Sequence, residues 1–369
     1  MIYLDYAANT PVLDEVLDEF NSATKKYIAN PNSSHKLGIE AKDKINEVST
    51  YLASYFKCNK EGIIYTSGSS ESNNLVIKGI ADKRKKLGNK IIISAVEHSS
   101  VIAPCNYLAS NGYDVSVIPL NNDGKVNLTK LEEEINDNTI LVSICSIDSE
   151  LGTVQPIKEI SDIVKKYPNC VFHTDATQAI GKINIDYSCV DFITFAPHKF
   201  YGLNGFGCLI NRNNIKLTPI IHGGKSTTIY RSGTPVTANV LALKKAFEIA
   251  INNLDERYNY IKKLSGYLKD ELSKMKCIHI NSPENSIPNT INISLINKDT
   301  KMIVEKLSDE GIYLSTKTAC SLDDVPSLSV LAITNNEQLA LNSMRISISH
   351  LTTKEEIDIL INKLSNLLS

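Results

Sequence analysis

The sequence predicts an α/β protein: a large domain in which helices sandwich a mostly parallel sheet, followed by a smaller α+β domain. Two features of the 369 residues carry this prediction. Through the middle of the chain, short β-branched and apolar runs alternate with helical patterns, and these runs are apolar on both faces. Strands of a parallel sheet need this pattern because helices cover both sides of the sheet. After about residue 250 the alternation stops, which indicates a second unit.

A series of apolar runs is expected to form the strands of the large sheet. Helices are expected between them, for example from about Glu71 onward and over 157–166. Strands that alternate with helices in this way are typical of a doubly wound α/β domain. The expected strands are 62–68, 90–97, 114–120, 139–147, 170–175, 191–196 and 207–211.

The second unit begins with an amphipathic helix over roughly 254–275. No Gly- or Pro-rich linker precedes this helix, so we expect the helix itself to connect the two domains. Short β-branched runs and two further helical patterns follow, which together indicate an α+β domain. The expected strands are 277–281, 289–295, 312–316 and 343–349, and the expected helices are 300–311 and 353–367.

The composition argues against several functional classes. The net charge is −2, so the sequence does not indicate a basic surface for nucleic-acid phosphates. The one dense basic run, over 82–90, fits a solvated helix end. No apolar stretch approaches the ~20 residues of a membrane span, and the N-terminal residues lack the apolar run of a signal peptide.

The eight cysteines are scattered along the chain and form no C-x-x-C pair. Neither a zinc ribbon nor a disulfide framework is therefore indicated. Several cysteines, such as Cys145, lie in apolar strand-like runs and are expected to be buried, reduced thiols. This cysteine usage favours a cytoplasmic protein.

Polar residues gather where predicted strands end, at the edge where open α/β sheets bind ligands. Taken singly, each group also has a structural explanation. The serines of 66–74 can bind an anion at a helix N-terminus, or they can cap that helix together with Glu71. A single histidine such as His98 is more often structural than catalytic. Asp175 can cap the next helix or hold a positive charge, and Lys199 can be a surface lysine just beyond its strand.

Taken together, these groups give one sheet edge an anion site, a histidine, a carboxylate and a lysine. Pyridoxal phosphate (PLP) needs this set, because it requires a lysine for the Schiff base, a carboxylate at the pyridine nitrogen and a phosphate site. The sequence has no G-x-G-x-x-G after a strand and no G-x-x-x-x-G-K-[ST], which argues against nicotinamide and P-loop sites. No pair of histidines has metal-ligand spacing, so we expect no metal site.

A series of motifs, in order along nearly the whole chain, resembles the PLP-dependent cysteine desulfurases of the class V aminotransferase family. Each motif alone is weak, but their joint order and spacing are specific. They are YLDYAANTPV (3–12), NPNSSHKLG (30–38), IIYTSGSSESNNLVIKG (63–79), VEHSSV (96–101), DSELGTVQPI (148–157), FHTDATQAIGK (172–182), HKFYGLNGFG (198–207), HGG (222–224), RSGTP (231–235), TACS (318–321) and MRISISHLTTKEEID (344–358).

The resemblance implies a fold-type I PLP enzyme. Its large PLP-binding domain would cover residues 14–250. Residues 1–13 and 251–369 would form the small domain, which carries the nucleophilic cysteine loop and the substrate arginine.

The same resemblance assigns roles to residues of the large domain. Lys199 would carry the cofactor as a Schiff base, and His98 would stack on the pyridine ring and help proton transfer. Asp175 would pair with the pyridine nitrogen, and Gln178 would bond the ring hydroxyl. The phosphate would lie among Ser69, Ser70 and His198, with Thr234 reaching a phosphate across a homodimer interface.

Two further residues complete the implied site. Arg345 would hold the substrate carboxylate, a task suited to a bidentate guanidinium. Cys320 would attack the sulfur of L-cysteine and keep it as a persulfide while L-alanine leaves. An iron–sulfur scaffold or a tRNA-thiolation protein would then accept the sulfur.

The sequence departs from the family pattern at several points. Ser149 replaces an asparagine that normally contacts the ring hydroxyl and the substrate carboxylate. We still expect Ser149 to belong to the cofactor site. Ala196 replaces a serine of the phosphate cup. The segment after Cys320 is slightly shorter than in the branch with a long mobile loop. By the same comparison, we do not expect the longer tail by which some members of the family dock a scaffold protein.

These departures leave alternatives open. One is a related PLP lyase or transaminase that acts on another small amino acid, including a selenocysteine lyase. Another is a weakly active paralogue with an interaction or regulatory role. Retention of Lys199, Asp175, His98, Cys320 and Arg345 argues against the second alternative.

Overall fold

The large domain is built on a mostly parallel sheet. The computed structural model describes residues 1–224, 226–316 and 325–368. In this part of the chain the main sheet has seven strands in the order β2-β8-β7-β6-β5-β3-β4. Their bounds are β2 Ile63–Thr66, β3 Lys90–Ser94, β4 Asp114–Ile118, β5 Thr139–Ser143, β6 Val171–Asp175, β7 Phe192–Phe195 and β8 Gly207–Asn211.

The direction of the strands brings their carboxyl ends to one edge. Strands β7, β6, β5, β3 and β4 pair in parallel, whereas β8 is antiparallel to both of its neighbours, β7 and β2. Because β8 is reversed, β2 again runs in the direction of the parallel strands. The predicted strands form, and the mostly parallel α/β sheet is confirmed.

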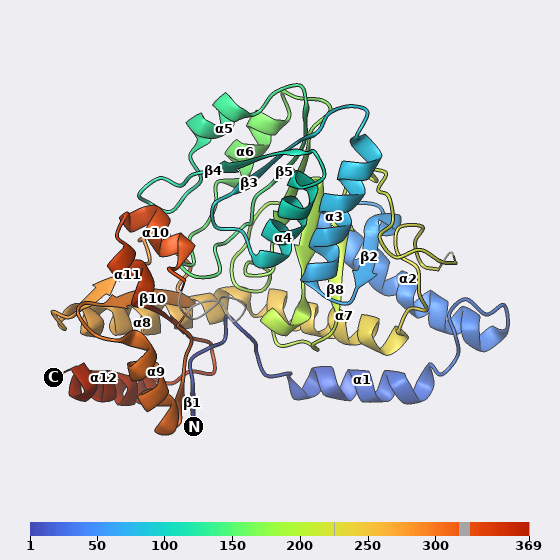
Figure 1. Cartoon of the computed structure of the whole chain (residues 1–369). Coiled ribbons are helices and arrows are strands. Elements are labelled where there is room, and N and C mark those ends of the chain that lie inside the picture. The colour runs from blue at the N-terminus through green and yellow to red at the C-terminus, as the bar shows by residue number, and fades with distance from the viewer. Residues whose placement is uncertain (225, 317–324, 369) are drawn as a thin grey trace.

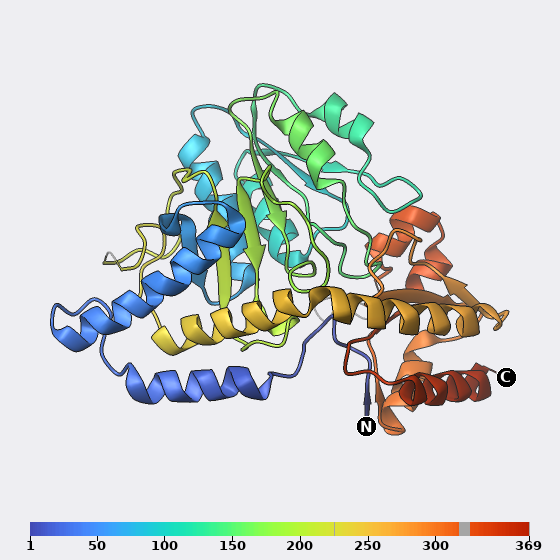
Figure 2. The same ribbon diagram turned by 180° about the vertical axis from the view of Figure 1, so that it is seen from behind.

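Helices cover both faces of this sheet, as the two-sided apolar pattern requires. Helices α3 (Ser69–Arg84) and α4 (Ser99–Ala109) cover one face (Figure 1). Helices α2 (Lys36–Phe56) and α7 (Thr237–Asn252) cover the other (Figure 2). Alternate side chains of β3 divide between the two layers: Ile91 and Ile93 join the first core and Ile92 joins the second. This division follows from the two-residue period of a strand.

Three more helices complete this part of the chain. Helices α5 and α6 contribute buried side chains to the same core as α2 and α7. Helix α1 packs along α7. Their bounds are α1 Asp14–Lys26, α5 Leu128–Glu134 and α6 Ile157–Val164.

The small domain has its own core. Its antiparallel sheet has the order β12-β10-β9, and the short strands β1 and β11 pair in parallel. The predicted strand over 312–316 is shorter than expected, because its partner β1 has only two residues. The bounds are β1 Ile2–Tyr3, β9 Ile278–Ile280, β10 Thr290–Leu295, β11 Ile312–Tyr313, β12 Ser343–Ser347, α8 Leu254–Ser273, α9 Thr300–Asp309, α10 Leu328–Thr334, α11 Glu337–Leu341 and α12 Lys354–Leu368.

The N-terminal residues belong to the small-domain core, although the chain then crosses to the large domain. Ile2 and Leu4 pack in the same cluster as buried residues of α8, β10 and β12. Helices α7 and α8 are separated only by Asn253 and run from one domain to the other (Figure 2). The division at residues 13 and 250 remains a prediction, and the separate cores support it.

Other predictions from composition can be compared with the structure. Cys105, Cys145, Cys170 and Cys208 are buried free thiols, as expected for cysteines in apolar runs. The basic run over 82–90 is only partly solvated: Lys90 is 7% exposed and forms an ion pair with Glu134 at 2.8 Å. No helix among the described residues is long and apolar enough to cross a membrane, and no cluster of potential metal ligands occurs among them.

Candidate active site

A cavity of about 410 Å³ lies at the carboxyl edge of the main sheet. It is bounded by the loops after β2, β3, β6 and β7, by the turn around Ser149, and by β12 of the small domain. Most of the site residues predicted from the sequence therefore line one space. They are Ser69, Ser70, His98, Ser149, Asp175, Gln178, His198, Lys199 and Arg345.

The first wall of the cavity is the N-terminus of α3. Gly68 precedes the helix, and no side chain caps its first turn. No atom lies within 4 Å of the position that a Cβ would take at Gly68, so the helix start faces open space. Ser69 Oγ lies 2.6 Å from Thr177 Oγ1, which ties the helix start to the loop after β6. Unpaired N–H groups and two hydroxyls beside a helix dipole make this wall suitable for a phosphate.

Asp175, at the end of β6, is held by two donors. Its Oδ2 accepts a hydrogen bond from Asn73 Nδ2 at 2.7 Å, and its Oδ1 accepts one from the Thr177 N–H at 2.9 Å. Asn73 also donates to Ser100 Oγ at 2.9 Å. The carboxylate is only 7% exposed, so it is fixed in the cavity wall and can hold a cationic ring nitrogen.

His98 caps a helix and also faces the cavity. It caps α4, because its Nδ1 accepts a hydrogen bond from the Ser100 N–H at 3.1 Å. Its ring also lines the cavity. Burial lowers the pKa of His98, although Asp175 opposes this shift. The ring is therefore neutral at neutral pH, with Nδ1 as an acceptor.

Lys199 ends η2 (Pro197–Lys199), the short 3₁₀ turn after β7. Its Nζ donates hydrogen bonds to Ala7 O at 2.7 Å and to Ala8 O at 2.6 Å. The neighbouring Thr10 bonds His198 O through both its N–H, at 3.0 Å, and its Oγ1, at 2.9 Å. The N-terminal segment thus holds the turn that presents the lysine amine to the cavity.

His198 precedes Lys199 in the same turn. Burial lowers its pKa to about 4, and the neighbouring lysines Lys199 and Lys182 add to this shift. At neutral pH the imidazole is therefore uncharged. It can offer one N–H donor to a ligand without contributing a positive charge.

Arg345, on β12, is the largest buried polar side chain at the site, with 2% exposure. Its Nη2 donates to Asp5 Oδ1 and its Nη1 to Ser149 O, each at 2.9 Å. Asp148 Oδ1 accepts from the N–H groups of Glu150 and Leu151, and this turn carries the Ser149 carbonyl. Arg345 Nε has no partner among the described residues. The guanidinium is thus fixed at the cavity with donor capacity left for a carboxylate.

The ion pair between Arg345 and Asp5 gives a prediction about stability. Asp5→Asn leaves the buried guanidinium without its counterion, and such a loss costs about 3 kcal/mol of unfolding free energy. Urea unfolding should show this loss. The control Asp123→Asn breaks an exposed ion pair with Lys125 at 3.8 Å and should change stability by less than about 1 kcal/mol. Equal, small effects of the two variants would contradict the assigned contact.

Glu97 directly precedes His98 in the loop after β3 and is only 6% exposed. Its Oε1 accepts from Ser94 Oγ at 2.6 Å and from the Cys145 N–H at 2.8 Å, whereas its Oε2 has no partner among the described residues. Burial raises its pKa to about 8. The side chain is therefore a neutral acid at neutral pH in the folded protein.

This raised pKa of Glu97 makes stability depend on pH with a defined sign. Between the ordinary pKa near 4.5 and about 8, only the folded state holds the proton, so its contribution to stability falls as pH rises. The slope is at most about 1.4 kcal/mol per pH unit. The stability of Glu97→Gln relative to the wild type should therefore increase from pH 5 to pH 8. Glu132→Gln, at an exposed position, is the control. A difference in stability between Glu97→Gln and the wild type that does not change with pH would refute the prediction.

Two of the residues singled out in the sequence lie outside the cavity, and a third cannot be placed. Ala196 is fully buried and does not line the cavity. Thr234 is exposed and lines a separate groove with Ser67 and Arg231. Cys320 lies outside the described residues. The carbonyl of Ser315 accepts a hydrogen bond from the Arg345 N–H at 2.7 Å.

The aminotransferase class-V family matches residues 2–360. The chain belongs to this family. Among its class-V relatives, the cysteine desulfurase IscS of Dictyoglomus turgidum is 36% identical over 372 aligned positions, which cover 100% of this chain and 94% of the relative. A solved NifS-like protein has a TM-score of 0.93 at 33% identity, covering 100% of this chain and 99% of that one.

A structure of SspA in complex with cysteine is also similar, with a TM-score of 0.83 at 30% identity. It covers 96% of this chain and 100% of that one. These comparisons confirm the predicted class-V family and the fold class.

Proposed function

We propose that this class-V enzyme is a PLP-dependent cysteine desulfurase that converts L-cysteine to L-alanine in the cavity at the carboxyl edge of the main sheet. The observation that carries this proposal is the meeting of three groups in one cavity. These groups are the Lys199 amine, the fixed Asp175 carboxylate and the open N-terminus of α3. The family, whose members depend on PLP, agrees with the cofactor expected from the sequence.

The chemistry of the lining residues fits PLP. The helix start and the hydroxyls of Ser69 and Thr177 suit the phosphate, and Asp175 suits the protonated ring nitrogen. Neutral His98 provides a flat, uncharged surface for a ring. When bound, PLP supplies an electron sink for negative charge at the substrate Cα. All three anchors belong to the large domain, so the cofactor would be held there.

Residues of the chain carry out the remaining steps. Lys199 attaches the cofactor and, as a free amine, takes the proton from the substrate Cα. Arg345 receives the substrate carboxylate, and its Nε, which has no partner among the described residues, is one donor left for this contact. The Cys320 thiolate attacks the substrate sulfur, so that the bond from Cβ to sulfur breaks. Carbon keeps the electron pair and is protonated to alanine, and the sulfur stays on Cys320 as a persulfide.

An assay of the products tests this function. The purified protein, incubated with L-cysteine and a thiol reductant, should release alanine and sulfide in equal amounts. A transaminase would instead need an oxo-acid acceptor and would release no sulfide. A protein that carries PLP but forms no alanine from cysteine would overturn the proposal. Turnover of selenocysteine with no turnover of cysteine would favour the selenocysteine lyase.

We also propose a cytoplasmic homodimer that passes its sulfur to an acceptor protein. Thr234 supports the dimer, because it is exposed beside Ser67 in a groove next to the loop that opens α3. A second copy placed there could bring its own Thr234 toward the phosphate. An iron–sulfur scaffold or a tRNA-thiolation protein is the kind of acceptor that a persulfide on Cys320 would serve.

A further inference from the structure

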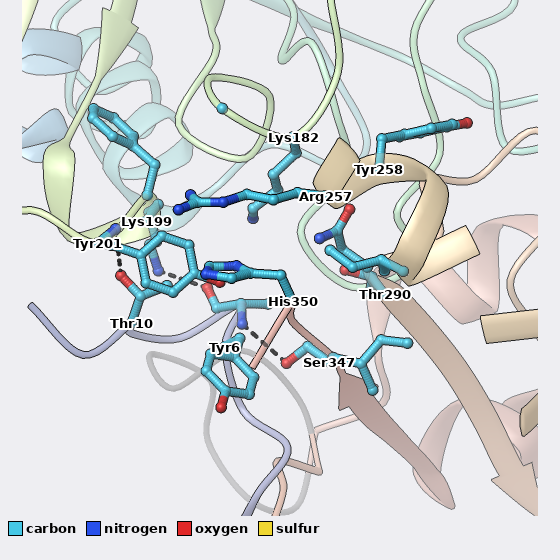
Figure 3. Close-up of a pocket in the computed structure, with 16 residues that line it drawn as sticks. Tyr6, Thr10, Lys182, Lys199, Tyr201, Arg257, Tyr258, Thr290, Ser347 and His350 are labelled. Carbon is cyan, nitrogen blue, oxygen red and sulfur yellow. Dashed lines mark hydrogen bonds between the residues drawn. The ribbon is translucent and has the colours of Figure 1, made fainter. Parts of the chain in front are cut away.

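A second lysine, Lys182, lies close to the site, although it does not line the main cavity. It lies in the turn after β6 and, with Lys199, lines a small cavity between this turn, α8 and β12 (Figure 3). That cavity measures about 20 Å³, which is room for about one water molecule. Among the described residues, no carboxylate lines this cavity. The main cavity and this one meet at Lys199.

Lys182 acts on the cofactor site through one side chain. Its Nζ donates a hydrogen bond to Gln178 Oε1. Gln178 Nε2 in turn donates to Ala7 O at 2.9 Å, and the same carbonyl accepts from Lys199 Nζ at 2.7 Å. Gln178 is 8% exposed and lines the main cavity.

The hydrogen-bonding groups leave Gln178 one orientation. A backbone carbonyl only accepts, so the amide nitrogen must face Ala7 O and the amide oxygen must face Lys182. An amide nitrogen carries two N–H groups, and one of them is used by Ala7 O. The second N–H is left for a ligand in the main cavity.

The position of Lys182 gives no other evident gain in the stability of the folded protein. Burial lowers its pKa well below the ordinary value, and the neighbouring cations Lys199 and Arg345 add to this shift. The Lys182 side chain is partly exposed. A partly buried amine beside cations is costly, and its neutral form is favoured. A residue retained only for stability would be better replaced by an apolar one.

We propose that Lys182 is a positioning residue that fixes the amide of Gln178, so that the free N–H of the amide is presented to the ring oxygen of the cofactor. This inference rests on the proposed function, because it requires PLP in the main cavity. Lys182 itself touches neither the cofactor nor the substrate. Its effect should therefore disappear when Gln178 is removed.

A double-mutant cycle on the apoprotein tests this dependence. Cofactor titration would give the dissociation constant of PLP for the wild type, Lys182→Met, Gln178→Met and the double variant. We expect Lys182→Met to weaken binding by about three- to tenfold, which is the size of one hydrogen bond. The visible absorption spectrum of the bound cofactor should also change. In the Gln178→Met background, Lys182→Met should have no further effect.

Further variants separate positioning from folding. Apo Lys182→Met should melt at the same temperature as the wild type or higher, because a partly buried amine beside cations is removed, although its cofactor affinity falls. Lys182→Arg keeps a donor and should retain affinity to within about threefold. Lys158→Met, at an exposed position, should change neither quantity.

The outcomes distinguish this inference from the proposed function. A wild-type protein that binds no PLP would refute the proposed function. A wild type that binds PLP while Lys182→Met binds equally well would overturn the positioning role. Equal effects of Lys182→Met with and without Gln178 would also overturn it, because they would show that Lys182 acts independently.

Discussion

Replacing Lys199 by alanine is expected to reduce alanine formation from cysteine by at least about a thousandfold. Loss of a positioned proton-transfer group alone costs roughly 10²–10⁴ in rate, and this variant also loses the covalent attachment of the cofactor. The helix start of α3 and the Asp175 carboxylate are unchanged in Lys199→Ala. The variant should therefore still take up PLP, but without the colour of the Schiff base.

An exposed lysine, Lys166, provides a control for the Lys199→Ala variant. The Lys199 amine is held by the carbonyls of Ala7 and Ala8, whereas Lys166 is exposed in an ion pair with Glu132. Lys166→Ala should keep wild-type turnover and colour. Lys199→Ala that forms alanine at the wild-type rate would show that another group does this work, and the assignment would fail.

Replacing Cys320 by serine should abolish persulfide formation and leave the cofactor site intact. Lys199, Asp175 and Arg345 are untouched, so the protein should remain yellow and should still respond spectrally to cysteine. Serine is a far weaker nucleophile than a thiolate, so alanine release should fall by at least about a hundredfold. Mass spectrometry after exposure to cysteine should find the extra sulfur on Cys320 of the wild type and on no residue of the variant.

The reactivity of the other cysteines can be compared with the role predicted for Cys320. Cys145 lines the main cavity, but it is 5% exposed and burial raises the pKa of its thiol well above the ordinary value. Burial also raises the pKa of Cys105 and Cys170 to about 12. These thiols are poor nucleophiles at neutral pH. Cys277→Ser, at a half-buried position, is a suitable control, and finding the persulfide mainly on Cys145 would refute the role of Cys320.

The positions of the main-sheet residues could be predicted from the sequence for a geometric reason. His98, Asp175 and Lys199 each follow an apolar run, and the carboxyl ends of parallel strands share one edge. The local apolar pattern predicts where each strand lies in the sequence. The direction of the strand then determines at which edge of the sheet the residue after it lies. The order of the strands was not needed for this inference.

Other parts of the site could not be read from a local pattern. The carbonyls of Ala7 and Ala8 hold Lys199 across more than 190 positions of sequence, and backbone groups carry no residue signal. Asn73 lies one turn into α3, where its contact with Asp175 depends on how that helix packs on the sheet. The polar run after Gly68 was the only hint of such a role.

Two further gaps have physical causes. Helices α10 and α11 have seven and five residues, too few for a helical period to be recognised. The loss of a hydroxyl at Ala196 could not be weighed from sequence, because the residue proves to be fully buried beside the cavity wall rather than part of it. The role proposed for Thr234 would require a second copy of the chain, which the sequence of one chain does not place.

Chemical trapping of the cofactor identifies the lysine to which it is attached. Borohydride reduces a Schiff base to a stable secondary amine, so treatment of the purified yellow protein followed by peptide mass spectrometry locates the attachment. We expect the pyridoxyl group on the peptide that contains Lys199, with none on Lys182. A pyridoxyl group on Lys182 or on another lysine, or none at all in a protein that desulfurates cysteine, would contradict this expectation.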